Sequence, residues 1–169
     1  MSQLNQFGQL IGDALPDWQP RPRPERVVLD GKFCRLEPLS LVHADALFAA
    51  HQQATDTRNW TWLLREPESS VEEYRQWVAS VENLQDPVHF AVIDRQTNLP
   101  VGSLALMRID PNNGVMEVGH VHFSPLLSRT PASTEAQWLL MRYAFDTLGY
   151  RRYEWKCNSF NEPSRKAAL

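Results

Sequence analysis

Residues 117–136 hold the side chains whose types and order best suit chemistry. A carboxylate, a glycine and two histidines follow one another along a predicted strand: Glu117, Gly119, His120 and His122. After a loop, Thr130 and Pro131 begin a predicted helix, with Thr134 as a second candidate cap. The first N–H groups of a helix lack internal partners and favour an anion, so a phosphate or pyrophosphate suits this position. The alternative is an ordinary capped helix, and most such helices bind nothing.

The two histidines also raise the question of a metal site. His120 and His122 stand two residues apart on one strand, which places them on one face, as paired metal ligands often are. The next acid, Glu135, lies inside a helix and does not complete a ligand set, so no metal is expected. Alternation puts Glu117 and Val121 on the opposite face. We interpret the histidines as core or pocket residues, with His120 a candidate for the acceptor site.

Length, composition and charge limit the class of protein. With 169 residues, 43% of them hydrophobic, the chain suits one globular domain. Its formal charge of -3 leaves no positive excess for phosphate backbones, so nucleic acid is not an expected partner. No apolar run of ~18 residues and no basic, apolar leader occur, which argues against a membrane span and against export. Cys34 and Cys157 lie far apart and suggest neither a disulfide framework nor a metal clamp, which fits a reducing cytoplasm.

Periodicity and capping residues predict the elements that position the polar stretch. Strands are predicted at 33–37, 88–94, 100–109, 115–123 and 150–157, and helices behind caps at Ser40, Ser70, Thr130 and Asn161. Short turns between the middle strands imply an antiparallel meander. The helix over 132–148 is apolar almost all round and is expected to be buried. Prolines predict an extended arm over 1–30, followed by one domain over 31–169 with a mixed α/β sheet.

Several of these segments resemble the GNAT superfamily of acetyl-CoA-dependent N-acetyltransferases, in particular the branch of ribosomal-protein N-terminal acetyltransferases. The similarity runs from about Gly31 to Leu169, through residues 35–39, 100–102, 117–120, 134–136 and 144–152. Asn158, Asn161 and Ser164 match the family's asparagine and serine positions. The family's sheet continues with further strands, so the resemblance implies a C-terminally truncated member whose last strands are missing.

The resemblance implies both a fold and an activity. The fold is a mostly antiparallel, twisted sheet with helices on both faces. The activity is direct transfer of acetyl from acetyl-CoA, as co-substrate, to a primary amine of a small molecule or a protein N-terminus. The alternative is a non-catalytic GNAT-like module that binds acyl-CoA or a protein partner. A homodimer stays open, because nothing in the sequence sets the oligomeric state.

The resemblance also implies roles for particular residues. Glu117 is the candidate base that deprotonates the amine, although a cross-strand ion pair is the alternative. Ser164 is the candidate that protonates or stabilises the leaving thiolate. Pantetheine is expected to pair with strand backbone where two strands splay apart, and Gly119 suits the bulge or close approach required there. The residues expected to bind the cofactor are His122, Phe123, Ser124, Arg129, Thr130, Ala132, Ser133, Thr134, Asn158 and Asn161.

The predicted pyrophosphate loop departs from the family's Gln/Arg-x-x-Gly-x-Gly/Ala pattern. One alignment places Ser128, Pro131 and Ser133 at the defined positions, and Pro131 has no N–H to donate. The other alignment places Arg129, Ala132 and Thr134 at these positions, and all three residues have a backbone N–H to donate. Neither supplies a glycine, which allows close backbone approach, so weakened or rearranged pyrophosphate binding is expected.

Two further features concern the acceptor side and the cysteines. A loop rich in tryptophan and arginine, with Arg58, Trp60, Trp62 and Arg65, lies beside the acceptor in the family's topology. The alternative is that its tryptophans belong to the core. Cys157 has no identifiable base and no positive neighbour beyond Lys156, so we expect a buried, unreactive cysteine.

Overall fold

The computed structural model describes residues 3–169, and its centre is a six-stranded sheet. The strands follow the order β3-β4-β5-β6-β7-β8, and only β7 and β8 run parallel. Their bounds are Leu29–Asp30 (β3), Cys34–Pro38 (β4), Val88–Asp94 (β5), Pro100–Asp110 (β6), Val115–Phe123 (β7) and Arg152–Trp155 (β8). The predicted mixed α/β fold and its central antiparallel meander are confirmed.

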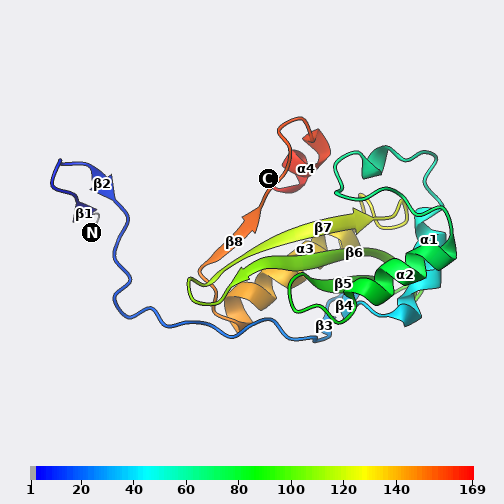
Figure 1. The fold of residues 1–169 in the computed structure, drawn as a ribbon, viewed down its shortest axis with the longest axis horizontal. Helices are drawn as coiled ribbons and strands as arrows, with labels where there is room; N and C mark the ends of the chain where they lie inside the picture. Colours follow the sequence, from blue (N-terminus) through cyan, green and yellow to red (C-terminus); the bar gives the residue numbers. More distant parts are fainter. Residues whose placement is uncertain (1–2) are drawn as a thin grey trace.

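Helices cover both faces of the sheet (Figure 1). Helices α1 (Ala44–His51) and α2 (Val71–Val81) lie on one face, and α3 (Pro131–Arg142) lies on the other. Side chains alternate along each strand, so Phe90 of β5 enters the core under α3 while its neighbour Ala91 packs toward α2. The core against α3 is the larger of the two.

Side-chain caps begin helices at three of the four predicted positions, Ser70, Thr130 and Asn161, whereas Ser40 precedes a 3-10 turn over Leu41–His43 and makes no side-chain cap hydrogen bond. Ser70 Oγ accepts a hydrogen bond from the Glu73 backbone N–H at 3.2 Å, and Glu73 Oε2 accepts from the Ser69 N–H at 2.8 Å. Asn161 Oδ1 caps α4 (Glu162–Ala167) by accepting from the Ser164 N–H at 3.2 Å. Each cap satisfies an N–H that the helix itself leaves without a partner.

The helix predicted over 132–148 differs from expectation in two ways. Its α-helical part ends at Arg142, and a π-helical turn follows over Tyr143–Thr147. Trp138 is 49% exposed and the Arg142 guanidinium lies 4.8 Å from the Trp138 ring centre, so the expectation of a fully buried helix is wrong. Only one side of α3 faces the sheet, and its apolar outer side chains remain in solvent.

The predicted last strand and its cysteine also need correction. Pairing with β7 extends only from Arg152 to Trp155, so β8 is shorter than the predicted strand over 150–157. Cys157 follows β8 and is exposed, which contradicts the expected buried cysteine, whereas Cys34 is buried in β4. No helix within residues 3–169 combines the length and hydropathy that a membrane crossing needs.

The N-terminal segment carries more structure than an extended arm. A short hairpin of β1 (Gln3–Leu4) and β2 (Leu10–Ile11) lies well away from the sheet (Figure 1). The chain then runs along the domain, where Trp18 Nε1 donates to the Asn112 carbonyl at 2.8 Å. Strand β3 also falls within the predicted arm, and it pairs with β4.

Candidate functional site

The carboxyl-terminal half of β7 has a strand partner on one side only. The pairing of β8 with β7 ends where Trp155 lies opposite Val118, and the chain then turns away toward α4 (Figure 1). We call this point the fork. From Gly119 to Phe123, β7 pairs with β6, and no other strand within residues 3–169 covers its second edge. The backbone groups of that edge are open to an extended ligand.

A β-bulge bends β7 at the fork. Gly119 lies opposite Ala105 and His122 lies opposite Ser103, so two residues, His120 and Val121, stand against one residue of β6. His120 has a φ of 49°, in the left-handed region. The bulge thus follows directly after Gly119, where the sequence favours a bulge or a close approach.

The bulge changes which residues share a face. Met116 and Val118 belong to the core under α3, so Glu117 between them faces α1 and α2. The extra residue then shifts the alternation by one, and His122 also faces α1. The prediction that Glu117 lies opposite the histidines is therefore wrong. Val121 packs against the core under α3, as the predicted separation from the histidines requires.

The Glu117 carboxylate is nearly buried at the fork and lies between two cations. Its side chain is 9% exposed, and Lys156 Nζ donates to its Oε2 at 3.0 Å. Arg108 Nε lies 3.4 Å from the same oxygen. Lys156 also contacts Glu154 Oε2 at 2.8 Å, and the two carboxylates raise the Lys156 pKa, the hydrogen bond to Glu154 being the largest single cause. The ion pair foreseen as one alternative is present, and it fixes the position of the Glu117 carboxylate at the fork.

The start of α3 follows β7 within a few residues and exposes backbone N–H groups. Thr130 is the cap, and its Oγ1 accepts from the Ser133 N–H at 3.4 Å. Pro131 occupies the first helical position, where a backbone N–H would have no helical partner. Within residues 3–169, no backbone or side-chain acceptor pairs with the N–H groups of Arg129 and Ala132. The helix therefore begins with two free donors near its positive end.

The segment after β8 is held by local hydrogen bonds. Asn158 Oδ1 accepts from the Phe160 N–H at 2.9 Å, and Asn161 caps α4. The indole Nε1 of Trp155 donates to Ser164 Oγ at 2.9 Å. Ser164 is thereby connected to the last residue of β8 and so to the fork. Both asparagines use their carbonyl oxygens locally and keep their NH₂ groups as donors.

A comparison with known protein families assigns this fold to a family. Residues 34–169 match the family of the acetyltransferase (GNAT) domain. The chain belongs to the GNAT family of acetyltransferases. Acetyl transfer is accordingly its expected activity, and the resemblance derived from the sequence is confirmed at the level of the family.

Solved GNAT structures agree with this assignment. A GCN5-related N-acetyltransferase from Brucella melitensis is 49% identical with a TM-score of 0.88, covering 91% of this chain and 70% of that one. A probable acetyltransferase of the GNAT family from Chromobacterium violaceum is 32% identical with a TM-score of 0.83, covering 94% and 79%. A Vibrio cholerae structure, provisionally described as a ribosomal-protein-serine acetyltransferase, is 22% identical with a TM-score of 0.72, covering 85% and 80%, and supports the fold alone. No curated protein matches the chain.

Histidines that are buried or half-buried cluster on the α1 and α2 side of the sheet. The His51 ring of α1 stacks on the His122 ring at 3.7 Å, and His89 lies 5.2 Å from His120. Burial, with a smaller contribution from Arg65, lowers the pKa of His51 to about 4. Burial likewise lowers the His122 pKa far below its usual range. The cluster is therefore neutral at pH 7, and no three His, Cys, Asp or Glu side chains in residues 3–169 are arranged to hold a metal.

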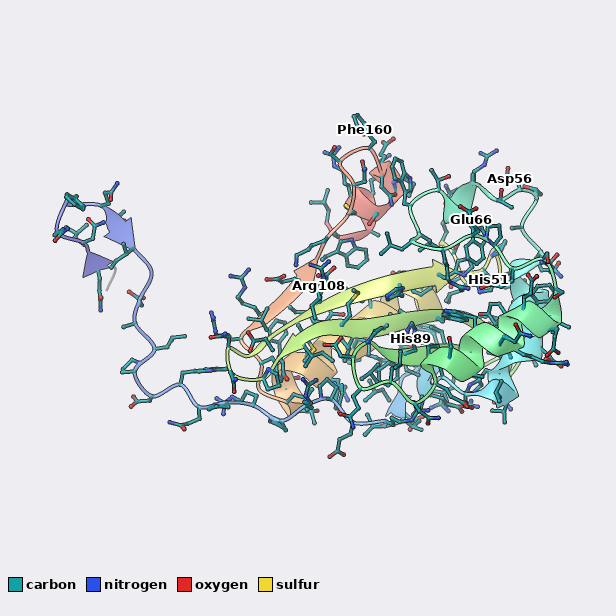
Figure 2. The ribbon with its side chains drawn as sticks, in the orientation of Figure 1. His51, Asp56, Glu66, His89, Arg108 and Phe160 are labelled. Carbon is teal, nitrogen blue, oxygen red and sulfur yellow. The ribbon has the colours of Figure 1, made fainter. Side chains whose placement is uncertain are left out.

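A loop folds over this histidine cluster, and Figure 2 shows Asp56 and Glu66 in that loop above His51. Trp60 packs edge-on against His122, with ring centres 4.1 Å apart. The Arg65 guanidinium lies 3.7 Å from the Trp77 ring centre and 4.8 Å from that of Trp60. The other two residues of the predicted group, Arg58 and Trp62, are exposed. Trp60 and Arg65 thus line the site, whereas Arg58 and Trp62 face solvent.

Glu135 has a positioning role that the sequence analysis missed. Its carboxylate accepts three backbone hydrogen bonds, from Lys32 at 2.7 Å, Phe33 at 2.6 Å and Cys34 at 2.9 Å. Burial alone would raise its pKa, but these donors hold the Glu135 pKa below its usual value. The contact ties α3 to the turn between β3 and β4. No local sequence pattern predicts this contact, because the backbone groups that donate to Glu135 are about a hundred residues away in the chain.

Proposed function

We propose that this chain transfers acetyl from acetyl-CoA directly to a primary amine, on a small molecule or at a protein N-terminus. The observation that carries the proposal is the fork, where an unpaired strand edge from Gly119 to Phe123 lies beside the buried carboxylate of Glu117. An extended thioester arm can pair with that edge, and an amine can reach the carboxylate next to it.

In this proposal pantetheine follows the open edge of β7 toward α3. The end of that path is formed by His122, Phe123 and Ser124. His122 is buried, so its backbone rather than its imidazole is the part that contacts the cofactor. A main-chain contact of this kind needs an unpaired edge and no particular side chain.

We place the pyrophosphate at the start of α3. The free N–H groups of Arg129 and Ala132 and the positive end of the helix favour an anion there. The Ser133 N–H is already bonded to Thr130, which favours the loop alignment that begins at Arg129. Thr134 adds a hydroxyl group at the same helix end, whereas the Thr130 hydroxyl already donates to the Leu127 carbonyl at 2.6 Å. A glycine is not needed where these donors suffice.

The chemistry assigned to this site is a proton transfer followed by acyl transfer. Glu117 takes a proton from the bound ammonium, and the amine nitrogen then bonds to the thioester carbonyl carbon. The carbon–sulfur bond breaks, and the CoA thiolate leaves and takes up the second proton that the nitrogen loses as the amide forms. Ser164 accepts from Trp155 through its oxygen and keeps its own hydrogen to donate to the sulfur. Asn158 and Asn161 contribute amide donors on the β8 side of the fork.

The experiment that tests this function is thiol release from acetyl-CoA with a panel of amines and of peptides with free N-termini. Glu117→Gln is expected to lower kcat by roughly 100-fold while leaving the acetyl-CoA Kd nearly unchanged, because only proton transfer is lost. Glu154→Gln is the matched control, since Glu154 lies opposite Glu117 in the sheet and shares Lys156.

Two results would contradict the proposal. Acetyl-CoA binding without thiol release for any amine would indicate the non-catalytic acyl-CoA-binding module. Equal losses of kcat and of acetyl-CoA affinity in Glu117→Gln would assign Glu117 a structural role.

A further inference from the structure

Lys156 places a primary amine at the fork itself. It follows directly after Trp155, the last residue of β8, at the point where β7 and β8 separate. Its Nζ lies 3.0 Å from Glu117 Oε2 and 2.8 Å from Glu154 Oε2. The Lys156 side chain is 52% exposed, and its Nζ is held by both carboxylates. An amine of this chain therefore occupies the carboxylate that an incoming acceptor would need.

This placement meets the geometric requirement for an acceptor. A group that loses its proton to a base must lie within about 2.6–3.2 Å of it, and Lys156 Nζ does so in the resting structure. The open edge of β7 begins one residue beyond the last β7–β8 pair, so a thioester lying there would be next to the amine. The two carboxylates keep Lys156 protonated, and it reacts only after Glu117 has taken its proton.

We propose that Lys156 is an intramolecular acetyl acceptor, so that the chain acetylates itself at this residue. The inference rests on the proposed function of the same site. Glu117 removes a proton from the Lys156 ammonium, and Nζ forms an amide bond to the acetyl carbonyl carbon. The carbon–sulfur bond breaks, and CoA leaves as a thiolate, which takes up the second proton that Nζ loses as the amide forms. The acetylated side chain is neutral, so Glu117 loses its nearest cation.

The other two lysines lack this arrangement and serve as internal controls. Lys32 Nζ lies over the Phe33 ring at 5.3 Å. Lys166 pairs with Glu162 at 2.7 Å on exposed α4, an ordinary helix ion pair. Lys166 is the better matched control, because it is also a lysine paired with a carboxylate but lies outside the fork.

The test is incubation of the 169-residue chain with acetyl-CoA and no added amine, followed by intact-mass measurement and peptide mapping. We expect a single acetyl group, on Lys156, at a rate constant independent of protein concentration. Lys156→Arg, which keeps the positive charge, abolishes the mass increase, and Lys166→Arg leaves it unchanged. Glu117→Gln slows labelling by roughly 100-fold, as expected from loss of a general base.

Several outcomes would overturn the inference, and they separate it from the proposed function. Labelling of Lys32, Lys166 or the N-terminus at the same rate, or equal labelling in urea, would indicate non-enzymatic acylation. A rate proportional to protein concentration would indicate transfer between copies. Acetylation of an added amine with Lys156 unmodified would leave the proposed function standing and remove self-acetylation. Absence of both reactions would contradict both.

Discussion

The two faces of the sheet are built from different kinds of side chain. Under α3 the buried residues are almost entirely hydrocarbon, including Phe90, Leu104, Leu106, Met116, Leu139 and Leu140. Under α1 and α2 a smaller apolar cluster borders the buried histidines and Glu117. Apolar burial stabilises a fold, whereas buried polar groups cost free energy unless they are paired. We therefore assign most of the stability to the α3 face, and the proposed chemistry to the opposite face.

The largest expected effect comes from truncating one side chain in the core under α3. Phe90 is fully buried under α3, and Phe90→Ala should lower the free energy of unfolding by about 3–5 kcal/mol through lost transfer energy and a cavity. Urea unfolding at neutral pH measures the loss. Phe33→Ala, at a 44% exposed site, is the control and should change stability little. A loss below about 1 kcal/mol for Phe90→Ala would contradict the assignment of stability to this face.

The polar face should make stability depend on pH. Burial lowers the pKa of His51 and His89 from 6.5 to about 4, so the folded state resists protonation that the unfolded chain accepts. The contribution of these two histidines to the free energy of unfolding is therefore fully present above pH 6.5 and is lost as the pH drops toward 4. His51→Leu should reduce this fall by up to roughly 3 kcal/mol while changing stability less at pH 7.5. Unfolding free energies at both ends of the range measure it, and an unchanged pH slope would refute the account.

The smallest expected effects come from removing one helix cap on each face of the sheet. Thr130→Ala on α3 and Ser70→Ala on α2 should each lower stability by about 1 kcal/mol, because each frees one helix N–H. Only Thr130→Ala should also weaken acetyl-CoA binding, since Thr130 holds the loop whose N–H groups are assigned to the pyrophosphate. Thermal melts with and without acetyl-CoA separate the two effects. Equal ligand-induced shifts in both variants would remove the pyrophosphate from this helix end.

Local signals were enough to predict most of the fold. The caps at Ser70 and Asn161 involve residues three apart, and the mostly apolar run of β5 is that of a strand buried on both faces. Turn residues between β5, β6 and β7 set the meander. The π-helical turn, the hairpin at the N-terminus and the early end of β8 were missed. The length of β8 depends on where its partner strand β7 bends, and the sequence of β8 alone does not predict that position.

The sequence indicated the individual residues of the candidate site but not the contacts between them. The sequence identified Glu117 as a carboxylate on a strand, but its partner Lys156 stands 39 positions further along the chain. The stacking of His51 on His122 joins a helix to a strand 71 positions away (122 − 51). Neither contact produces a periodic pattern in the sequence. Each depends on how the helices and strands pack against one another and not on residues that are neighbours in the chain.

The order of residues by itself determined most of the elements, the family resemblance and the candidate groups, since caps, alternation and motifs act over a few positions. Tertiary structure decided which of those groups meet. One inserted residue at His120 turned the end of β7 over and brought Glu117 and His122 onto one face, which strict alternation forbids. The separation of β8 from β7 then left a backbone edge open beside that carboxylate. Both depend on pairing across strands, where the geometry of the partner outweighs local propensity.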